Sequence, residues 1–169
     1  PMVLCRAAHA VASVNNDIDS GMAFVDRALK VNPSLPLAWY VSGWLRLFQG
    51  KPRVAAEHLE RALDLGVIDP MTFKVQTALS YAYFFLGRHD KGAAISSRIT
   101  RARPSYQTAL RSAAANHAFG GRAEEARRMI MSSLAYNPKQ RVSGLPDLLP
   151  FHGRAQMDMW SDALHRAGL

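Results

Sequence analysis

The stretch LAWYVSGWLRLFQGKPRVAAEHLERAL, residues 37–63, places small residues at regular positions within two segments of helical composition. Gly43 lies inside the first segment, Gly50 lies between the two, and Ala55 and Ala62 lie inside the second. Antiparallel helices approach closely only where the side chains at their crossing are small. A glycine between them permits the positive φ at which a helix ends and the chain turns. The stretch therefore predicts a hairpin of two helices.

The same spacing recurs along the chain in frames of 34 residues. Gly87 and Gly121 take the turn position in two later frames, as Gly50 does in the quoted stretch. Prolines cannot continue a helix, and they close three of the frames, at Pro33, Pro104 and Pro138. The sequence therefore predicts a single domain, residues 1–169, with repeats at about 2–35, 36–69, 70–106 and 107–140 and a C-terminal capping segment at 141–169.

The frames depart from a strict repeat at three positions and contain one insertion. Asn16 replaces the first turn glycine, Arg46 replaces an aromatic residue, and Val67 replaces the second closing proline. Three extra residues separate the second and third frames. There we expect Asp69 to cap the next helix and Pro70 to be its first residue.

The C-terminal segment has apolar residues at helical spacing. A terminal repeat needs a cover, because no further repeat buries its apolar face. We therefore expect a helix to dock on the fourth repeat through a stripe formed by Met157, Trp160, Ala163, Leu164 and Ala167. No comparable segment precedes Met2, so we expect the chain to be part of a longer polypeptide.

A 34-residue period with two helices in each unit resembles the tetratricopeptide repeat (TPR) family. The resemblance implies an all-α fold, an α-α superhelix (TPR solenoid) of about four helix-turn-helix repeats plus a C-terminal capping helix. In such repeats the first helix of each unit lines a concave groove, and the second helix lies on the outer side.

Whole phrases narrow the resemblance further. DPMTFKVQTALSYAYFFLGRHDKGAA, residues 69–94, and LPFHGRAQMDMWSDALHRAGL, residues 149–169, resemble the C-terminal repeat region of bacterial class III adenylate/guanylate cyclases, especially those of rhizobia. In those proteins the catalytic domain lies near the N-terminus and the repeats follow it. Similar repeats also follow winged-helix DNA-binding domains in some transcriptional regulators. The repeats therefore do not identify the effector domain to which they are attached.

The chain itself lacks the patterns of a catalytic, cofactor-binding or metal-binding site. Cys5 is the single cysteine, and no two of the six histidines lie three or four residues apart. The glycines after the helices lack the lysine-serine ending of a phosphate loop. We therefore expect no enzyme activity, no cofactor and no metal in this segment, although the parent chain can be a cyclase.

The groove positions that the TPR resemblance implies carry aromatic and basic side chains. Rigid aromatic residues bury large areas at a modest entropic cost, which suits recognition of a peptide or helix. The alternative is that several of the aromatic residues pack between neighbouring repeats. The predicted partner-binding groove contains Arg6, Tyr40, Trp44, Phe48, Lys74, Tyr81, Phe84, Phe85, Arg111 and Phe119.

Charge is concentrated in one part of the chain. The sequence has 21 Lys and Arg against 13 Asp and Glu, a formal net charge of +8. Residues 97–141 contain nine basic residues, with only Glu124 and Glu125 as acids. A basic sector can attract an acidic partner, an anionic membrane surface or nucleic acid, and a solvated arginine face is the simpler interpretation. We assign to this basic sector Arg98, Arg101, Arg103, Arg122, Arg127 and Arg128.

These observations predict a protein-interaction or regulatory module. Its expected partner is a protein or peptide, or another domain of the same polypeptide, held in the concave groove. The alternative is a module associated with nucleic acid through the basic sector. No apolar run reaches the ~18–20 residues that span a bilayer, so we expect no membrane insertion and a cytoplasmic location.

Overall fold

The structure of the chain, a computed structural model, describes residues 1–14, 17–66, 71–144, 149 and 151–169. The described residues contain helices and no strand. In chain order the elements are α1 (Met2–Val14), α2 (Ile18–Val31), α3 (Pro36–Phe48), α4 (Pro52–Asp64), α5 (Thr72–Phe85), α6 (His89–Ala102), α7 (Gln107–Phe119), α8 (Ala123–Tyr136), the short 3-10 helix η1 (Val142–Gly144) and α10 (Arg154–Arg166).

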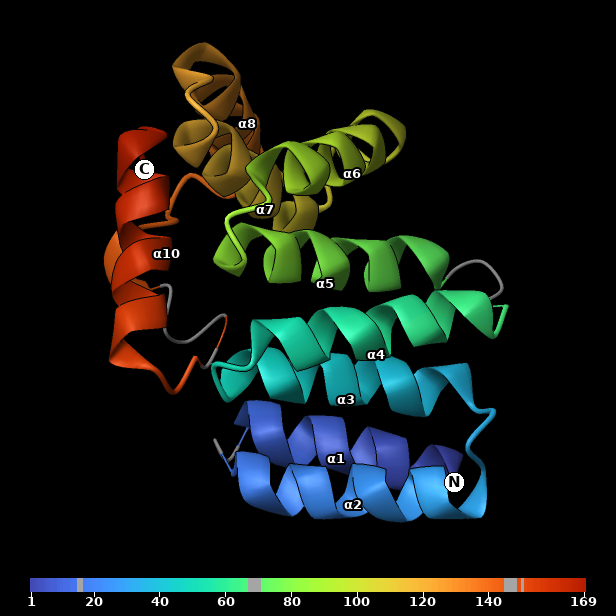
Figure 1. The fold of residues 1–169 in the computed structure, drawn as a ribbon. Coiled ribbons are helices and arrows are strands. Elements are labelled where there is room, and N and C mark those ends of the chain that lie inside the picture. The colour runs from blue at the N-terminus through green and yellow to red at the C-terminus, as the bar shows by residue number, and fades with distance from the viewer. Residues whose placement is uncertain (15–16, 67–70, 145–148, 150) are drawn as a thin grey trace.

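The first eight helices form antiparallel hairpins that stack in sequence (Figure 1). Each odd-numbered helix packs against its successor, and α1, α3, α5 and α7 also contact one another in order. Successive hairpins are rotated, so that α8 at the top of the view no longer runs parallel to α2 at the bottom. This arrangement is the α-α superhelix that the sequence predicts.

The turns within three hairpins follow the predicted glycines. Gly50, Gly87 and Gly121 have φ of 76°, 70° and 73°, a conformation that other residues rarely adopt. After Gly50, the Lys51 amide donates back to the Arg46 carbonyl at 2.9 Å, the bond that closes a Schellman motif. The corresponding turn of the first hairpin contains Asn16, which lies outside the described residues.

Small residues inside the helices leave space for side chains of the neighbouring helix. A Cβ added to Gly43 of α3 would lie 2.5 Å from Cγ of Leu59 in α4, well inside contact distance. A Cβ on Gly92 of α6 would overlap the buried Asn116 side chain of α7. The first contact lies within a hairpin and the second joins two repeats. Glycine therefore permits close packing both within a repeat and between neighbouring repeats.

The ends of the second helices lie where the prolines predict them. Pro33, Pro104 and Pro138 each follow directly after the C-cap residue of α2, α6 and α8. Of the predicted insertion, Val67, Asp69 and Pro70 lie outside the described residues, and the described part of the next helix begins at Thr72.

The C-terminal helix α10 lies across the stack rather than along it (Figure 1). Its predicted apolar stripe faces the repeats, because Trp160, Ala163, Leu164 and Ala167 are buried and Met157 is half-buried. The helix packs on α7 and α8 of the fourth repeat. It also reaches the second repeat, where Gln156 Nε2 donates to the Leu47 carbonyl at 3.1 Å. One helix therefore ties the second, third and fourth repeats together.

No helix in the described part of the chain is both long enough and apolar enough to cross a membrane.

Candidate functional site

The face formed by α1, α3, α5 and α7, here called the A-helix groove, contains most of the predicted partner-binding residues. Its two halves differ. The half nearer the C-terminal ends of these helices is covered by Phe151 and by α10, and the half nearer their N-terminal ends contains open pockets.

The covered half contains a continuous set of aromatic contacts. Trp160 of α10 lies against Tyr81 and Phe84 of α5, with ring centroids 4.8 Å and 5.7 Å apart. Phe151, just before α10, lies 5.9 Å from Phe48 and 5.0 Å from Phe85. The chain therefore supplies its own aromatic side chains to the half of the groove that is richest in them.

This packing corrects the expectation that the aromatic groove residues face a partner. Trp44, Phe48, Tyr81 and Phe84 are buried, and the Tyr81 hydroxyl donates to the Thr108 carbonyl at 3.1 Å. The alternative stated for these residues, that they pack within the chain, describes them better. The covering element is α10 and the segment before it, in addition to the adjacent repeats.

Two further predicted residues lie at the edge of the covered half. Phe85 is half-buried against Phe151, and Phe119 lies 5.4 Å from Phe84. The guanidinium of Arg166 lies 5.0 Å from the centre of the Phe119 ring, a cation–π contact. Phe119 therefore helps to hold α10 on the repeats, and Phe85 holds the residue Phe151 that precedes it.

The open half brings together three predicted residues from three helices. Arg6 of α1, Tyr40 of α3 and Lys74 of α5 line a pocket of about 300 Å³, together with Cys5, His9, Ala10, Leu37, Val41 and Met71. A second pocket of about 220 Å³ shares Tyr40, Leu37 and Met71 with the first. No described residue that lines either pocket is acidic. The open half is therefore apolar at its base and cationic at its rim.

Burial shifts the pKa of three side chains in the open half, Tyr40, Cys5 and His9. Burial raises the pKa of Tyr40 to about 12, so its hydroxyl stays protonated. Burial also raises the pKa of the Cys5 thiol, which keeps it in the unreactive protonated form. Burial, with a smaller contribution from Lys74, lowers the pKa of His9. The arrangement is suited to binding an anionic group and apolar side chains, not to covalent chemistry.

Arg111 of α7, also a predicted groove residue, is buried and held by the segment that follows α8. Its Nη1 donates to Oε1 of Gln140 at 3.2 Å, and among the described residues no carboxylate pairs with it. Gln140 Oε1 also accepts from the Ser133 hydroxyl at 3.2 Å. Arg111 therefore fastens the end of the fourth repeat from within and is not exposed to a partner.

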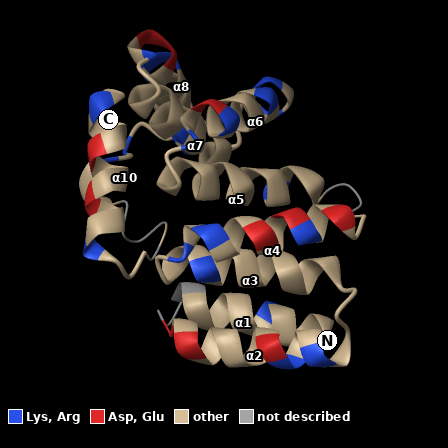
Figure 2. Ribbon diagram, viewed as in Figure 1, with Lys and Arg blue, Asp and Glu red and all other residues tan. Residues whose placement is uncertain are grey.

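The basic sector does not form one uniform face (Figure 2). Arg103 stacks on Phe73 of α5 at 4.1 Å, and Arg128 pairs with Glu125 at 3.3 Å. Arg122 pairs with Asp90 of α6 at 2.6 Å. The other residues of the sector, Arg98, Arg101 and Arg127, are exposed and make no ion pair with a described residue. Half of the sector is therefore used in packing or ion pairing.

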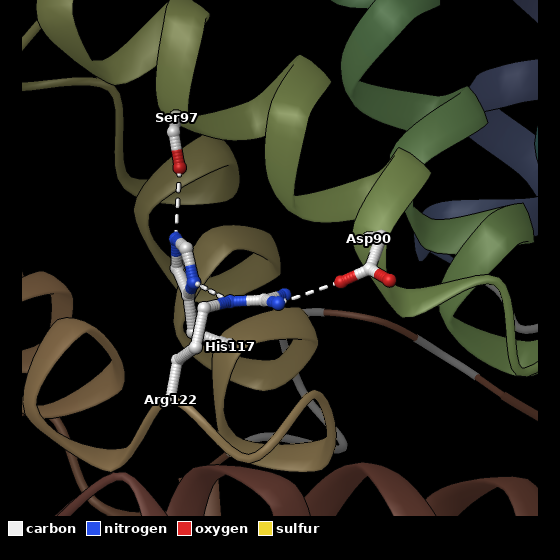
Figure 3. A network of polar contacts seen from close by, with 4 residues as sticks. All are labelled: Asp90, Ser97, His117 and Arg122. Atoms are coloured by element: carbon white, nitrogen blue, oxygen red, sulfur yellow. Dashed lines mark hydrogen bonds and ion pairs between the residues drawn. The ribbon is translucent and has the colours of Figure 1, made fainter.

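A polar network near this sector was not predicted from the sequence (Figure 3). Arg122 Nε donates to His117 Nδ1 at 2.9 Å, and His117 Nε2 lies 2.9 Å from Ser97 Oγ. Because Nδ1 accepts a hydrogen bond from Arg122, the neutral imidazole carries its own proton on Nε2 and donates it to Ser97. This tautomer cannot remove a proton from the hydroxyl, so the pair does not activate a nucleophile.

The four residues of this network come from α6, α7 and the turn before α8, and no local motif in the sequence joins them. Burial, followed by the charge of Arg122, lowers the pKa of His117 and keeps the imidazole neutral. Among the described residues, no group of three or more Cys, His, Asp or Glu side chains could hold a metal ion.

Comparison with known proteins identifies the fold through solved structures. No protein-family model and no curated protein matches the chain. A thermophilic TPR protein of Thermus thermophilus is similar with a TM-score of 0.71 and 21% identity, over 98% of this chain and 91% of that one. PilW, a type IV pilus biogenesis factor, gives a TM-score of 0.71 and 14% identity, over 96% and 73%.

YrrB, described as a TPR protein with an unusual peptide-binding site, gives a TM-score of 0.63 and 18% identity, over 97% of this chain and 82% of YrrB. Identities at this level establish the fold and leave the ligand undetermined. The chain therefore has the α-α superhelical fold of tetratricopeptide-repeat proteins.

Proposed function

We propose that the chain is a protein-interaction module that binds an acidic peptide or an acidic segment of a partner protein in the open half of the A-helix groove. The observation that carries this proposal is the pocket of about 300 Å³ with Arg6 and Lys74 at its rim and no acidic residue in its lining. Opposite charge increases the association rate and selects against basic partners. The apolar base formed by Leu37, Tyr40 and Met71 adds a surface on which a side chain of the ligand can be buried.

The covered half supports the same proposal by limiting where a ligand can lie. Phe151 and Trp160 occupy the aromatic part of the groove. The space that remains for a ligand is the pocket between α1, α3 and α5. A short peptide with one or two anchoring side chains fits such a space better than a long helix. YrrB, which has the same fold, is described as having a peptide-binding site, and this supports a peptide as the class of ligand.

The test compares two charge-reversal variants of equal net charge. Arg6→Glu/Lys74→Glu changes the rim of the pocket, and Lys30→Glu/Arg53→Glu changes two exposed residues on the outer helices α2 and α4. Fluorescence anisotropy with a library of labelled acidic peptides first selects binders of the unmodified chain. We expect the substitutions at the rim to lower the affinity for these peptides by about tenfold or more, and the substitutions on the outer helices to lower it by about twofold or less. Equal losses in both variants would contradict the proposal.

The resemblance to cyclase repeat regions supports a second, finer proposal, that the module regulates an attached adenylate/guanylate cyclase domain in the cytoplasm. We expect no conversion of ATP or GTP by this chain with Mg²⁺ or Mn²⁺. Removal of the region from a longer cyclase chain should change that enzyme's activity. Turnover by this chain alone would show that the chemistry has been assigned to the wrong part of the polypeptide.

Nucleic-acid binding through the basic sector has less support as an alternative function. Arg122 and Arg128 are paired with carboxylates, and Arg103 is stacked on Phe73. Nucleic-acid binding depends on several cations that are available to neutralise phosphates and release counterions. Duplex DNA is therefore included as a competitor in the peptide assay, and we expect it not to displace the selected peptides.

A further inference from the structure

A third pocket, of about 690 Å³, lies between α6 and α8 on the outer side of the superhelix, away from the A-helix groove. It is lined by a stripe of α6 and a facing stripe of α8, with His117 of α7 between them. None of its lining residues is shared with the pockets of the A-helix groove. The proposal below is therefore independent of the proposed function.

The two walls have the periodicity of helix surfaces. On α6 the lining residues Asp90, Ala94, Ser97 and Arg101 follow one another at three- and four-residue intervals. Facing them, α8 and the turn before it provide Arg122, Glu125, Met129 and Ser132 at similar intervals. Each wall therefore extends over about three helical turns, or ~15 Å. We call this feature the α6–α8 groove.

The α6 wall of the α6–α8 groove contains small side chains. Ala93 and Ala94 lie beside Ser97 on α6, and Ala94 is exposed although it faces a second helix across the groove. Helices pack by placing a ridge of one into a groove of another, and small residues allow the closest approach. The small side chains of this wall therefore leave room for another helix to approach α6.

One ion pair joins the two walls of the α6–α8 groove. At the N-terminal ends of the two helices, Arg122 pairs with Asp90 at 2.6 Å and donates to His117 (Figure 3). Toward the other end lie Arg101, which makes no ion pair with a described residue, and Arg128, which is exposed and pairs only with its helix neighbour Glu125. The lining therefore has three arginines against two carboxylates, and Arg101 is the one charged side chain of the lining that makes no ion pair with a described residue.

Two hydroxyl groups of the lining can donate a hydrogen bond to a ligand. Ser97 Oγ accepts the hydrogen bond of His117 Nε2, so its own hydroxyl proton can be donated toward the groove. Ser132 is exposed on the opposite wall.

We propose that the α6–α8 groove docks an acidic amphipathic α-helix of a partner protein. A seam of small apolar residues would lie over Ala94, and carboxylates on one flank would face Arg101 and Arg128. A helix fits better than an extended segment, because it satisfies its own backbone hydrogen bonds and helical walls offer no unpaired backbone groups. The module then holds two partners at once, one on each side of the superhelix.

The test uses charge-reversal pairs on the same two helices. Arg101→Glu/Arg128→Glu changes residues that line the groove. The control Arg98→Glu/Arg127→Glu makes the same change in net charge at exposed residues of α6 and α8 that do not line it. The probe is a labelled synthetic helix with glutamates along one flank of an alanine and leucine seam. A helix of the same pattern with lysines and a DNA duplex are compared with it by fluorescence anisotropy.

We expect the acidic helix to bind, the groove pair to weaken it by about tenfold or more, and the control pair to weaken it by about twofold or less. Equal effects of the two pairs would show attraction by net charge alone and overturn the proposal. Failure of the acidic helix to bind, or tighter binding of the lysine helix or the duplex, would overturn it as well.

A steric variant separates this groove from the A-helix groove. Ala94→Trp fills the α6–α8 groove from an exposed position, and Ala123→Trp places the same side chain at the exposed start of α8, outside the lining. We expect Ala94→Trp alone to abolish binding of the acidic helix while circular dichroism and Tm stay unchanged. Peptides selected for the A-helix groove should bind both variants equally. The experiment therefore distinguishes a failure of helix docking in the α6–α8 groove from a failure of peptide binding in the A-helix groove.

Discussion

Trp160 of α10 packs against Tyr81 of α5 with ring centroids 4.8 Å apart, and both side chains are completely buried. This contact joins the C-terminal helix to the third repeat. It places the largest side chain of α10 in the position that a ligand's aromatic anchor would take in an uncovered groove. The C-terminal segment is therefore part of the core of the superhelix.

Trp160→Ala should lower the free energy of unfolding by about 3–5 kcal/mol, because it leaves a large cavity between Tyr81 and Phe84. Chemical denaturation measures the change. Asp158→Ala on the exposed side of the same helix is the control and should cost less than about 0.5 kcal/mol. A loss in Trp160→Ala no larger than in the control would mean that α10 does not contribute to the core.

Gly43→Ala should destabilise the chain by about 1–3 kcal/mol, although alanine is ordinarily the better helix former. The added methyl would lie 2.5 Å from Leu59 Cγ, so α3 and α4 would have to move apart. In a Leu59→Ala background the same change should be neutral or stabilising, because the obstructing side chain is gone. A double-mutant cycle by thermal or chemical denaturation measures this coupling, and additive effects would exclude it.

Acid should destabilise the folded chain through His117. The pKa of His117 is lowered in the folded state, so the unfolded chain binds the proton more readily. The stabilising contribution of the neutral imidazole is therefore complete above about pH 6.5 and is lost as the pH falls below it. Protonation would place a proton on Nδ1 facing Arg122 Nε and break the hydrogen bond between them.

His117→Gln should accordingly show a smaller decrease in Tm than the unmodified chain between about pH 7 and about pH 5. The charged groups around His117 are Asp90 on α6 and Arg122, Glu125 and Arg128 at the start of α8. A decrease remains in the variant because burial also lowers the pKa of His9, His58 and His89. Identical decreases in both proteins would show that His117 stays neutral throughout this range.

Cys5 should react with a thiol reagent at least about 100-fold more slowly in the native chain than in denaturant. Its side chain is fully buried in α1, and burial raises the pKa of the thiol. Because Cys5 is the single cysteine, the absorbance change on reaction with a disulfide reagent follows this site alone. Rapid reaction in native buffer would show that α1 separates readily from α2 and α3.

The sequence by itself determined the repeats, because their signals are local. Gly50, Gly87 and Gly121 permit a backbone conformation that other residues avoid, and the closing prolines end helices wherever they stand. Small residues such as Gly43 also have a local signature, since their spacing repeats with the helical period. The α-α superhelix could therefore be predicted in outline.

Only the tertiary structure decided which side of each helix is open. Tyr81 and Phe84 occupy groove positions by their place in the repeat, and they are buried because Trp160 covers them. A helical stripe shows that a face is apolar without showing which distant element will cover it. The contact between Ser97 and His117 likewise depends on the rotation between successive repeats, because Ser97 belongs to α6 and His117 to α7 of the next hairpin, and the two meet only after the hairpins have stacked.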